Sequence, residues 1–428
     1  MERHPISRRK FVQLSSAAAA SLSFFPPVWA SASTESPLSL SAMVSAKTEQ
    51  NLIGAYGPWA TSLVGDNIPS WSFRQKKFTN IDKWRKSARA KVAEKLASPY
   101  TGGVPEVTVH KTYTYDGLQV EEISWQLPYG NPTEAIVLKP AGATGKLPAI
   151  LAFHDHGGNK YFGKRKITRT TDSQHPDMVT HQQEYYSGKA WANEIAKRGY
   201  VVLVADAFTF ASRRVLLADV PEYNRNGLSD DNPEDSRNIE AYNRWAGEHE
   251  HIMAKSLFCA GTTWPGVFLA EDQRALDVLC AREDVDTDRI GCGGLSGGGL
   301  RTALAGGMDP RIKCAVCVGF MSTWRDFLLN KSFTHTWMTY IPLLAPQLDF
   351  PEVFALRAPL ATMVLNDEDD FLYTLPEMKR ADAMIAEVFQ KAGAADRYKC
   401  SYYPGPHKFD TEMQTEAFDW FDRWLKNG

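Results

Sequence analysis

The residues best suited to do chemistry lie between Ile290 and Leu300, where the sequence is Ile-Gly-Cys-Gly-Gly-Leu-Ser-Gly-Gly-Gly-Leu. Its centre is a Gly-x-Ser-x-Gly pattern, with Ser296 between Gly294 and Gly298. A serine on a sharp strand-to-helix turn needs neighbours without side chains, and the turn exposes its hydroxyl as a nucleophile. Because the pattern also occurs in ordinary glycine-rich turns, an acid and a histidine must follow in the right order to decide the matter.

Acidic residues follow the predicted strand that ends at Asn366. The apolar run Leu356 to Leu365 is followed by Asn-Asp-Glu-Asp-Asp. A carboxylate just past a strand in this position can orient a catalytic histidine. Asp369 stands three places after Asn366, the usual offset, so we predict it as the acid, with Asp370 second and Asp367 third.

A histidine follows in the last loop of the chain. His407 comes after a Gly-Pro pair that ends the last strand-like run, and a helix-like segment follows at once. The order Ser296, Asp369, His407 is the order in which a strand-based serine hydrolase presents nucleophile, acid and base. We therefore predict that these three side chains form a catalytic triad.

A second glycine-containing loop follows the apolar run 147–153, in the sequence His-Asp-His-Gly-Gly at 154–158. Such a loop brings backbone N–H groups to a developing oxyanion, so we predict Gly297, Gly157 and Gly158 as its donors. The two histidines of this loop resemble a metal-binding pair. We interpret them as loop braces, because no further ligands follow at zinc-like spacing, and we expect no metal or other cofactor.

Strands and helices alternate around these motifs. The pattern predicts a helix over Tyr185 to Arg198, a strand over Tyr200 to Ala205, a helix over Val267 to Ala281 and a strand over Ile312 to Phe320. This alternation indicates a parallel sheet, whose sites lie beyond the carboxyl ends of its strands.

The alternation stops between about Val215 and Ala260, which we interpret as an insertion that forms a lid over the catalytic face. The side chains expected to contact the substrate are Phe208, Trp245 and Trp264, with His249 and His251 as further candidates.

The N-terminus resembles a twin-arginine export signal. Arg8 and Arg9 precede a short apolar run, Leu14 to Phe25, and the small residues 30–32 suit a cleavage site. We therefore expect a signal peptide over 1–32, a helical extension over 33–100 that includes a helix from Ile81 to Leu96, and a main domain over 101–428. The expected location is periplasmic or secreted. The apolar run is too short for a stable membrane anchor.

The composition is that of a soluble globular protein. Of the 428 residues 43% are hydrophobic and 23% charged, and the formal net charge is −2. This balance gives no electrostatic reason to expect nucleic acid as a partner. The six cysteines are expected to be free thiols, because the twin-arginine route exports proteins already folded in a reducing compartment.

Taken together, the chain from Val107 onward resembles the α/β-hydrolases of the acetyl xylan esterase and dienelactone hydrolase type. The resemblance rests on segments 154–158, 204–208, 286–291 and 294–298 and on the Gly-Pro-His at 405–407. It implies an α/β fold with a mostly parallel central sheet flanked by helices. A serine nucleophile in place of the cysteine of dienelactone hydrolases points to ordinary ester cleavage.

We accordingly expect a serine carboxylic-ester hydrolase that acts on a small-molecule or oligosaccharide ester, with acylated plant polysaccharide fragments as candidate substrates. One alternative is a serine peptidase of the prolyl-oligopeptidase kind, although no propeller-like repeats precede the domain. Another is a non-catalytic binding protein on a hydrolase scaffold. The sequence leaves the oligomeric state open.

Overall fold

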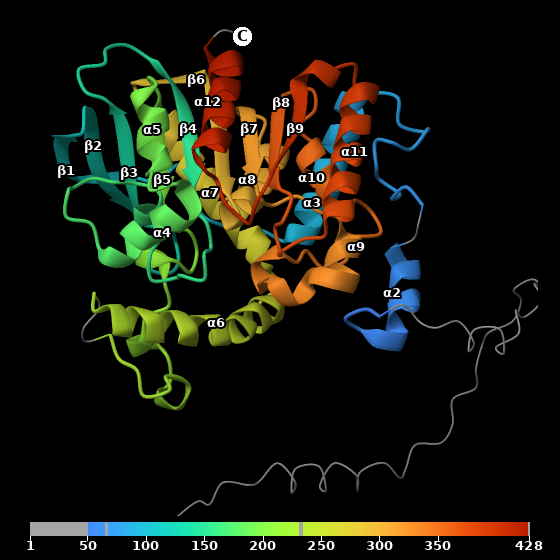
Figure 1. Cartoon of the computed structure of the whole chain (residues 1–428), viewed down its shortest axis with the longest axis horizontal. Helices are drawn as coiled ribbons and strands as arrows, with labels where there is room; N and C mark the ends of the chain where they lie inside the picture. The colour runs from blue at the N-terminus through green and yellow to red at the C-terminus, as the bar shows by residue number, and fades with distance from the viewer. Residues whose placement is uncertain (1–49, 65–66, 231–233, 427–428) are drawn as a thin grey trace, which may run out of the picture. The chain divides into compact units, whose positions relative to one another are not determined.

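Nine strands form one central sheet, in the order β1-β2-β3-β5-β4-β6-β7-β8-β9. The computed structural model describes residues 50–64, 67–230 and 234–426 (Figure 1). The strands are β1 (Val107–Tyr115), β2 (Leu118–Trp125), β3 (Thr133–Pro140), β4 (Leu147–Phe153), β5 (Val201–Ala205), β6 (Val285–Leu295), β7 (Ile312–Val318), β8 (Ala361–Asp367) and β9 (Tyr398–Tyr403).

The sheet begins antiparallel and continues parallel. β1, β2, β3 and β5 pair antiparallel, and a turn at Asp116-Gly117 joins the first two strands. From β5 through β4, β6, β7 and β8 to β9 every pairing is parallel. All carboxyl ends of the parallel strands therefore meet at one edge, where the predicted catalytic residues lie.

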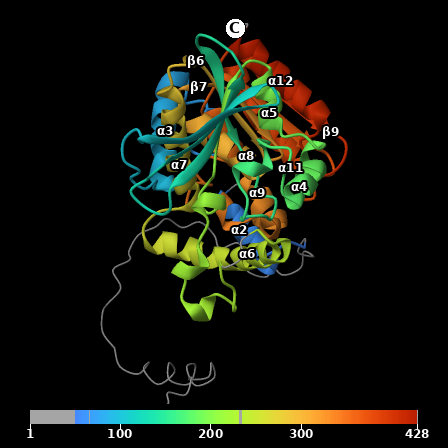
Figure 2. The same cartoon turned by 90° about the vertical axis from the view of Figure 1, so that its left-hand side faces the viewer.

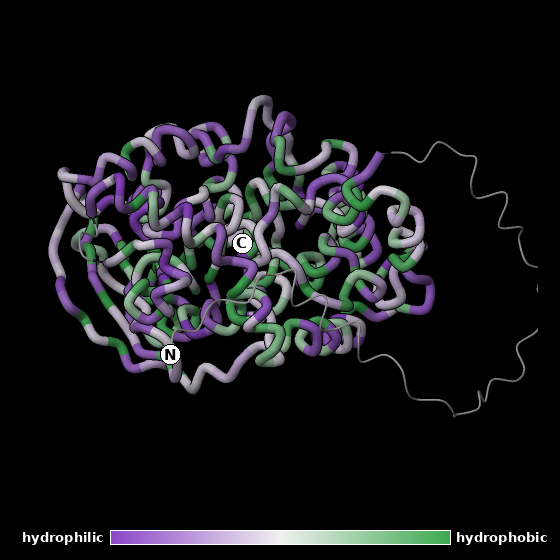
Figure 3. The backbone as a smooth tube through the Cα atoms, turned by 90° about the horizontal axis from the view of Figure 1, so that it is seen from below, coloured by the Kyte–Doolittle hydropathy of each residue, from purple (hydrophilic) through white to green (hydrophobic). Residues whose placement is uncertain are grey.

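Helices cover both faces of the sheet (Figures 1 and 2). One hydrophobic core joins the sheet to α3 (Ile81–Leu96), α7 (Trp264–Cys280), α8 (Gly297–Met308), α10 (Phe350–Ala355) and α11 (Leu375–Lys391). The other joins the opposite face to α4 (Pro176–Tyr186), α5 (Trp191–Lys197) and α12 (Thr411–Leu425). In Figure 3, hydrophobic and hydrophilic stretches alternate along the backbone, as expected for elements that bury one side. The mostly parallel sheet flanked by helices confirms the predicted fold.

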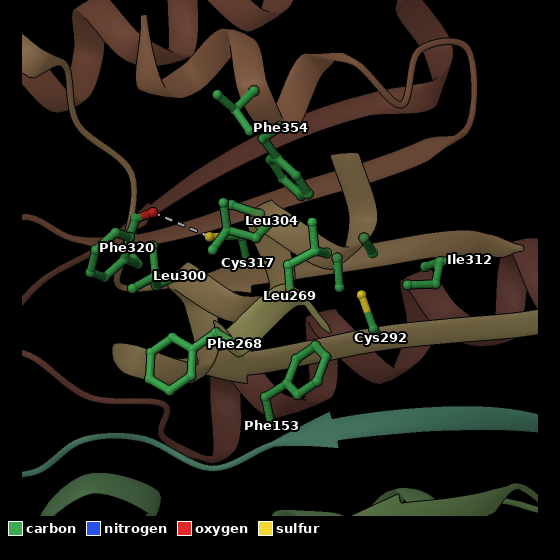
Figure 4. Packing of buried hydrophobic residues seen from close by; sticks show 14 of the residues in the cluster. Phe153, Phe268, Leu269, Cys292, Leu300, Leu304, Ile312, Cys317, Phe320 and Phe354 are labelled. Atoms are coloured by element: carbon green, nitrogen blue, oxygen red, sulfur yellow. Dashed lines mark hydrogen bonds between the residues drawn. The ribbon is translucent and has the colours of Figure 1, made fainter. Parts of the chain in front are cut away.

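The first core is densely filled with aromatic and aliphatic side chains (Figure 4). Cys317 lies there with its thiol 3.3 Å from the carbonyl oxygen of Phe320, whereas Cys314 belongs to the other core. The two cysteines thus lie on opposite faces of β7, as a strand requires. All six cysteines of the chain are free in the structure.

Two predicted elements differ from the structure. The helix expected over 185–198 is broken by Ser187 and Gly188, both with positive φ, into α4 and α5. The strand expected over 356–365 begins only at Ala361, because α10 and a turn occupy the residues before it, and it runs on to Asp367.

The N-terminal region is described from residue 50. α2 (Gly57–Val64) precedes the predicted helix α3, whose Trp84, Ala88, Val92 and Leu96 are buried in the first core. The described residues from 50 onward form one compact unit, and the domain boundary near 100 stays a prediction. The predicted export signal, 1–32, lies outside the described residues. Among the described helices, none combines the length and apolar character that crossing a bilayer requires.

The predicted insertion contains a long helix, α6 (Ser236–Cys259), after a series of short turns. A second long irregular segment, which the sequence analysis did not single out, follows β7. It runs from Phe320 to Leu348 and holds α9 (Trp324–Asp326) together with several single helical turns.

Candidate active site

The turn between β6 and α8 has the strained geometry expected of a nucleophile elbow. Ser296 has φ 59° and ψ −118° and is followed directly by the first residue of α8. A Cβ atom at Gly294 or Gly298 would lie 2.4 or 2.5 Å from the carbonyl oxygen of Phe153. Only glycine fits at these two positions, so the glycines are a steric requirement of the turn.

The imidazole of His407 is bonded to a buried carboxylate. Its Nδ1 lies 2.6 Å from Oδ2 of Asp370, whose side chain is buried. Burial alone would lower the pKa of His407, but the bond to Asp370 outweighs it and the pKa is raised. A histidine held in this way is suited to accept a proton and to carry the resulting charge.

The prediction of Asp369 as the partner of His407 is wrong. Asp369 accepts the backbone N–H of Gly405 at 3.0 Å instead. The offset argument took the strand to end at Asn366, but β8 continues to Asp367. Counting the same three places from the true end of the strand gives Asp370, which the sequence analysis ranked second.

A further acid, Asp367, lies close to the histidine. Its Oδ2 accepts the N–H of Lys408 at 2.9 Å, while its buried Oδ1 has no hydrogen-bond partner among the described residues. Burial raises the pKa of Asp367 to about 7. Oxygen or nitrogen atoms of Asp367, Asp370 and His407 lie within 4.8 Å of one another, close enough to reach a single ion. Because Asp370 and His407 already bond each other, we assign the group to proton transfer rather than to metal binding.

Ser296 and His407 line the same cavity, which has a volume of about 540 Å³. The Nε2 atom of His407 is buried and makes no hydrogen bond to any described residue. Gly319, with φ 56°, gives the ring its room, since a Cβ atom there would lie 2.8 Å from Cε1 of His407. Sequence analysis missed Gly319, although a glycine directly after an apolar strand was an available signal.

The predicted oxyanion donors are partly wrong. Gly297, Gly157 and Gly158 all line the cavity. The N–H of Gly158, however, donates to Nδ1 of His156 at 3.0 Å and is therefore occupied. The backbone nitrogen of His156 lies 3.0 Å from the point where a Cβ atom of Gly297 would stand. Gly297 and Gly157 stay predicted donors, and the amide of His156, next to Gly297, is a further candidate.

The two loop histidines act as braces, in line with the interpretation from sequence. His154 bonds the carbonyl oxygen of Asp155 at 2.9 Å and the N–H of Ala207 at 3.2 Å, and burial lowers its pKa to about 3. Nε2 of His156 lies 3.2 Å from Glu250, so α6 of the insertion contacts the loop directly.

None of the predicted substrate contacts Phe208, Trp245 and Trp264 lines the cavity. Trp264 is buried in the first core, and Phe208 packs against it with ring centroids 5.6 Å apart. Trp245 is buried in a small cluster within the insertion and stacks on His249. His251, a further candidate, bonds Lys255 and also does not line the cavity.

A second wall of the cavity comes from the segment after β7 and from the loop after β8. The lining residues on this side are Phe320, Thr334, His335, Thr336, Met338, Thr339, Phe371 and Leu372. Asp155 and Glu184 are the acids in the lining, and no lysine or arginine of the described chain is part of it. The cavity is therefore suited to an uncharged, largely apolar ligand.

Comparison with known proteins bears on the fold and on the general type of enzyme. Residues 262–363, from the residues before α7 to β8, match the model of the prolyl oligopeptidase family. That stretch contains Ser296 but ends before Asp370 and His407. The chain is 26% identical to a provisionally named hydrolase, YtaP of Bacillus subtilis (strain 168), over 309 residues, which is 72% of this chain and 88% of that protein.

Two solved structures share the architecture. A provisionally assigned acetyl xylan esterase from Bacteroides fragilis NCTC 9343 superposes with a TM-score of 0.58 at 17% identity, covering 84% of each chain. A glucuronoyl esterase from Solibacter usitatus superposes with a TM-score of 0.55 at 15% identity, covering 83% of this chain and 97% of that one. The chain has the α/β-hydrolase fold. The similarities support a hydrolase of the serine α/β-hydrolase type.

Proposed function

We propose that the protein is a serine carboxylic-ester hydrolase with Ser296 as nucleophile, His407 as general base and Asp370 as the acid that orients the histidine. The observation that carries this proposal is a single cavity of about 540 Å³ lined by Ser296, His407 and the glycine loop. Acyl transfer requires a nucleophile, a carboxylate-bound imidazole and free backbone amides at one point.

The mechanism follows from these positions. His407 takes the proton of Ser296 as the serine oxygen attacks the ester carbonyl, and the amide of Gly297, with the loop amides of His156 and Gly157, holds the oxyanion. The histidine then gives its proton to the departing alcohol, which leaves an acyl-enzyme. Water, deprotonated by His407, attacks that acyl group, and the carboxylic acid is released as the serine regains its proton.

The substrate we propose is an uncharged ester whose acyl or alcohol part is larger than an acetyl group, such as an acylated sugar fragment. The apolar wall and the absence of lysine or arginine from the described lining favour a neutral ligand. The likeness to a provisionally assigned acetyl xylan esterase and to a glucuronoyl esterase is consistent with a carbohydrate ester.

A serine peptidase is the second candidate, because residues 262–363 match the prolyl oligopeptidase family. Purified protein and its Ser296→Ala variant should be assayed on p-nitrophenyl acetate, on longer acyl esters and on aminoacyl p-nitroanilides. We expect serine-dependent cleavage of the esters alone. Cleavage of anilides but not esters identifies a peptidase, and no serine-dependent turnover of either supports the binding protein.

We also propose that the protein is exported through its N-terminal Arg8-Arg9 pair. Cell fractionation tests this directly, since changing both arginines to lysine is expected to keep the protein in the cytoplasm. Export that does not depend on the two arginines contradicts the proposal.

A further inference from the structure

The ammonium group of Lys166 is buried against the loop 154–158, whose His156 amide lies next to Gly297. The side chain of Lys166 is fully buried, and its Nζ donates to the carbonyl oxygens of Asp155 at 2.9 Å and His156 at 2.8 Å. Lys166 does not line the cavity. Its two bonds therefore act on the loop without a contact to the cavity.

The bonds from Lys166 fix the direction of two peptide groups. In a trans peptide the C=O and the following N–H point in opposite directions. The carbonyl of Asp155 shares its peptide with the N–H of His156, and the carbonyl of His156 shares its peptide with the N–H of Gly157. With both carbonyls on one ammonium, both N–H groups point away from Lys166, and the amide nitrogen of His156 lies next to Gly297.

The positive charge of Lys166 has a second effect on the same peptide groups. A cation at the carbonyl end of a peptide polarises the group and makes its N–H a stronger donor to an anion. Burial lowers the pKa of Lys166 to about 8, and the carboxylate of Asp155, 3.7 Å away, opposes that shift. The ring of Phe210 also faces the ammonium, with its centroid 4.9 Å from Nζ. These two neighbours favour the charged form of the lysine.

We propose that Lys166 is a positioning residue that aims and polarises the amide of His156 toward the oxyanion and fixes the direction of the Gly157 amide beside it. The inference rests on the proposed ester hydrolysis and adds a residue that touches neither substrate nor triad. Because an oxyanion is present only in the transition state, loss of Lys166 should lower kcat and leave KM nearly unchanged.

The test compares two lysines of the same short helical turn, Lys164–Lys166. Lys166→Met removes both bonds to the loop. Lys164→Met is the matched control, because Lys164 pairs with Asp206 and Glu134 and its side chain makes no bond to the loop carbonyls. Lys166→Arg restores the charge. Lys166→Gln keeps a donor without the charge. It is assayed as well, and it replaces Lys166→Met in the comparison if that variant fails to fold.

We expect kcat of Lys166→Met to fall about 10²-fold with KM within about threefold, the loss typical of a missing oxyanion donor. The affinity for an alkylboronic acid, which mimics the tetrahedral intermediate, should fall in parallel. Lys166→Gln should lose about 10-fold in kcat, Lys166→Arg should recover part of the loss, and Lys164→Met should melt earlier but keep its kcat.

The outcomes separate this inference from the proposed function. If folded Lys166→Met or Lys166→Gln matches Lys164→Met in kcat and in boronate affinity, the role of Lys166 is contradicted while ester hydrolysis stands. A wild-type protein that lacks Ser296-dependent ester cleavage overturns both.

Discussion

The cavity has two sides that are built in different ways. On the catalytic side, Ser296, His407 and the loop 154–158 each follow the end of a parallel strand, and hydrogen bonds hold His407 and the loop in place. The second wall comes largely from the segment Phe320–Leu348, whose single helical turns present threonine, methionine and histidine side chains.

We infer that the two sides have different roles: the catalytic side sets turnover, and the wall sets the preference for ester size. Changes on the catalytic side should lower the turnover of every ester by the same factor, because each ester passes through the same oxyanion and the same proton transfer. Changes on the wall should alter the ratio between esters of different size. The predictions below test that difference in roles, from the largest expected effect to the smallest.

The largest effect is expected for Asp370→Asn, which should lower kcat/KM about 10³- to 10⁴-fold for short and long esters alike, because the amide no longer stabilises the imidazolium. The pKa of His407 should also fall once the carboxylate that raises it is gone. The acidic limb of the kcat/KM profile should therefore move to lower pH.

Asp369→Asn is the matched control for this change, because Asp369 bonds only the backbone of Gly405 among the described residues. Its kcat/KM should stay within about threefold of wild type. A larger loss in Asp369→Asn than in Asp370→Asn contradicts the assignment of the acid.

The next effect is expected at Thr336, a half-buried residue of the wall. Thr336→Trp adds an indole to the cavity and should lower kcat/KM for p-nitrophenyl octanoate about 10-fold or more, with the acetate ester within about threefold. Thr336→Ser keeps the oxygen that accepts the N–H of Met338 and serves as the control. An equal loss of kcat/KM for both esters contradicts the claim that this wall discriminates between esters by size.

Asp367→Asn should have a smaller effect on catalysis, equal for all esters, and a measurable effect on stability. The pKa of Asp367 is raised from 3.8 to about 7 in the folded protein. The folded state then binds more protons than the unfolded state between these values, so the acid costs stability as pH rises through this window.

Because Asn carries no charge, the variant should exceed wild type in unfolding free energy by on the order of 1 kcal/mol at pH 8. The advantage should vanish near pH 4, where both side chains are neutral. Urea denaturation at the two pH values measures it. If the gain in unfolding free energy of Asp367→Asn is larger at pH 4 than at pH 8, the raised pKa of Asp367 is contradicted.

The smallest catalytic effect is expected for Trp245→Phe in the insertion. The indole donates to the carbonyl of Asn224 at 2.7 Å, so its loss should cost about 1 kcal/mol of stability. The kcat/KM values for short and long esters should not change. A selective loss on either ester returns Trp245 to the role of substrate contact that the sequence suggested.

The fold and the catalytic side were largely predictable, because their signals are local. The glycines around Ser296 meet the steric demand of one turn, and the alternation of strand and helix brings the strand ends to one edge. The choice between Asp369 and Asp370 depends on where β8 stops. That point is set by pairing with β9, which a single sequence does not reveal.

The wall and the oxyanion loop were less predictable, because their features depend on contacts between distant residues. Gly158 was a reasonable donor until the ring of His156 was found to occupy its N–H. Trp245 lies in an aromatic insertion, but its ring packs within the insertion itself. The segment Phe320–Leu348 carries no motif, and only its place beside the elbow gives it a role.

The central claim is that one serine, activated by His407, attacks the substrate, and covalent labelling tests it most directly. After reaction with diethyl p-nitrophenyl phosphate, intact-protein mass spectrometry should show a single phosphoryl adduct, and peptide mapping should find it on Ser296. The adduct should form far more slowly in His407→Ala. Labelling of another residue, or labelling at an unchanged rate without His407, contradicts the account.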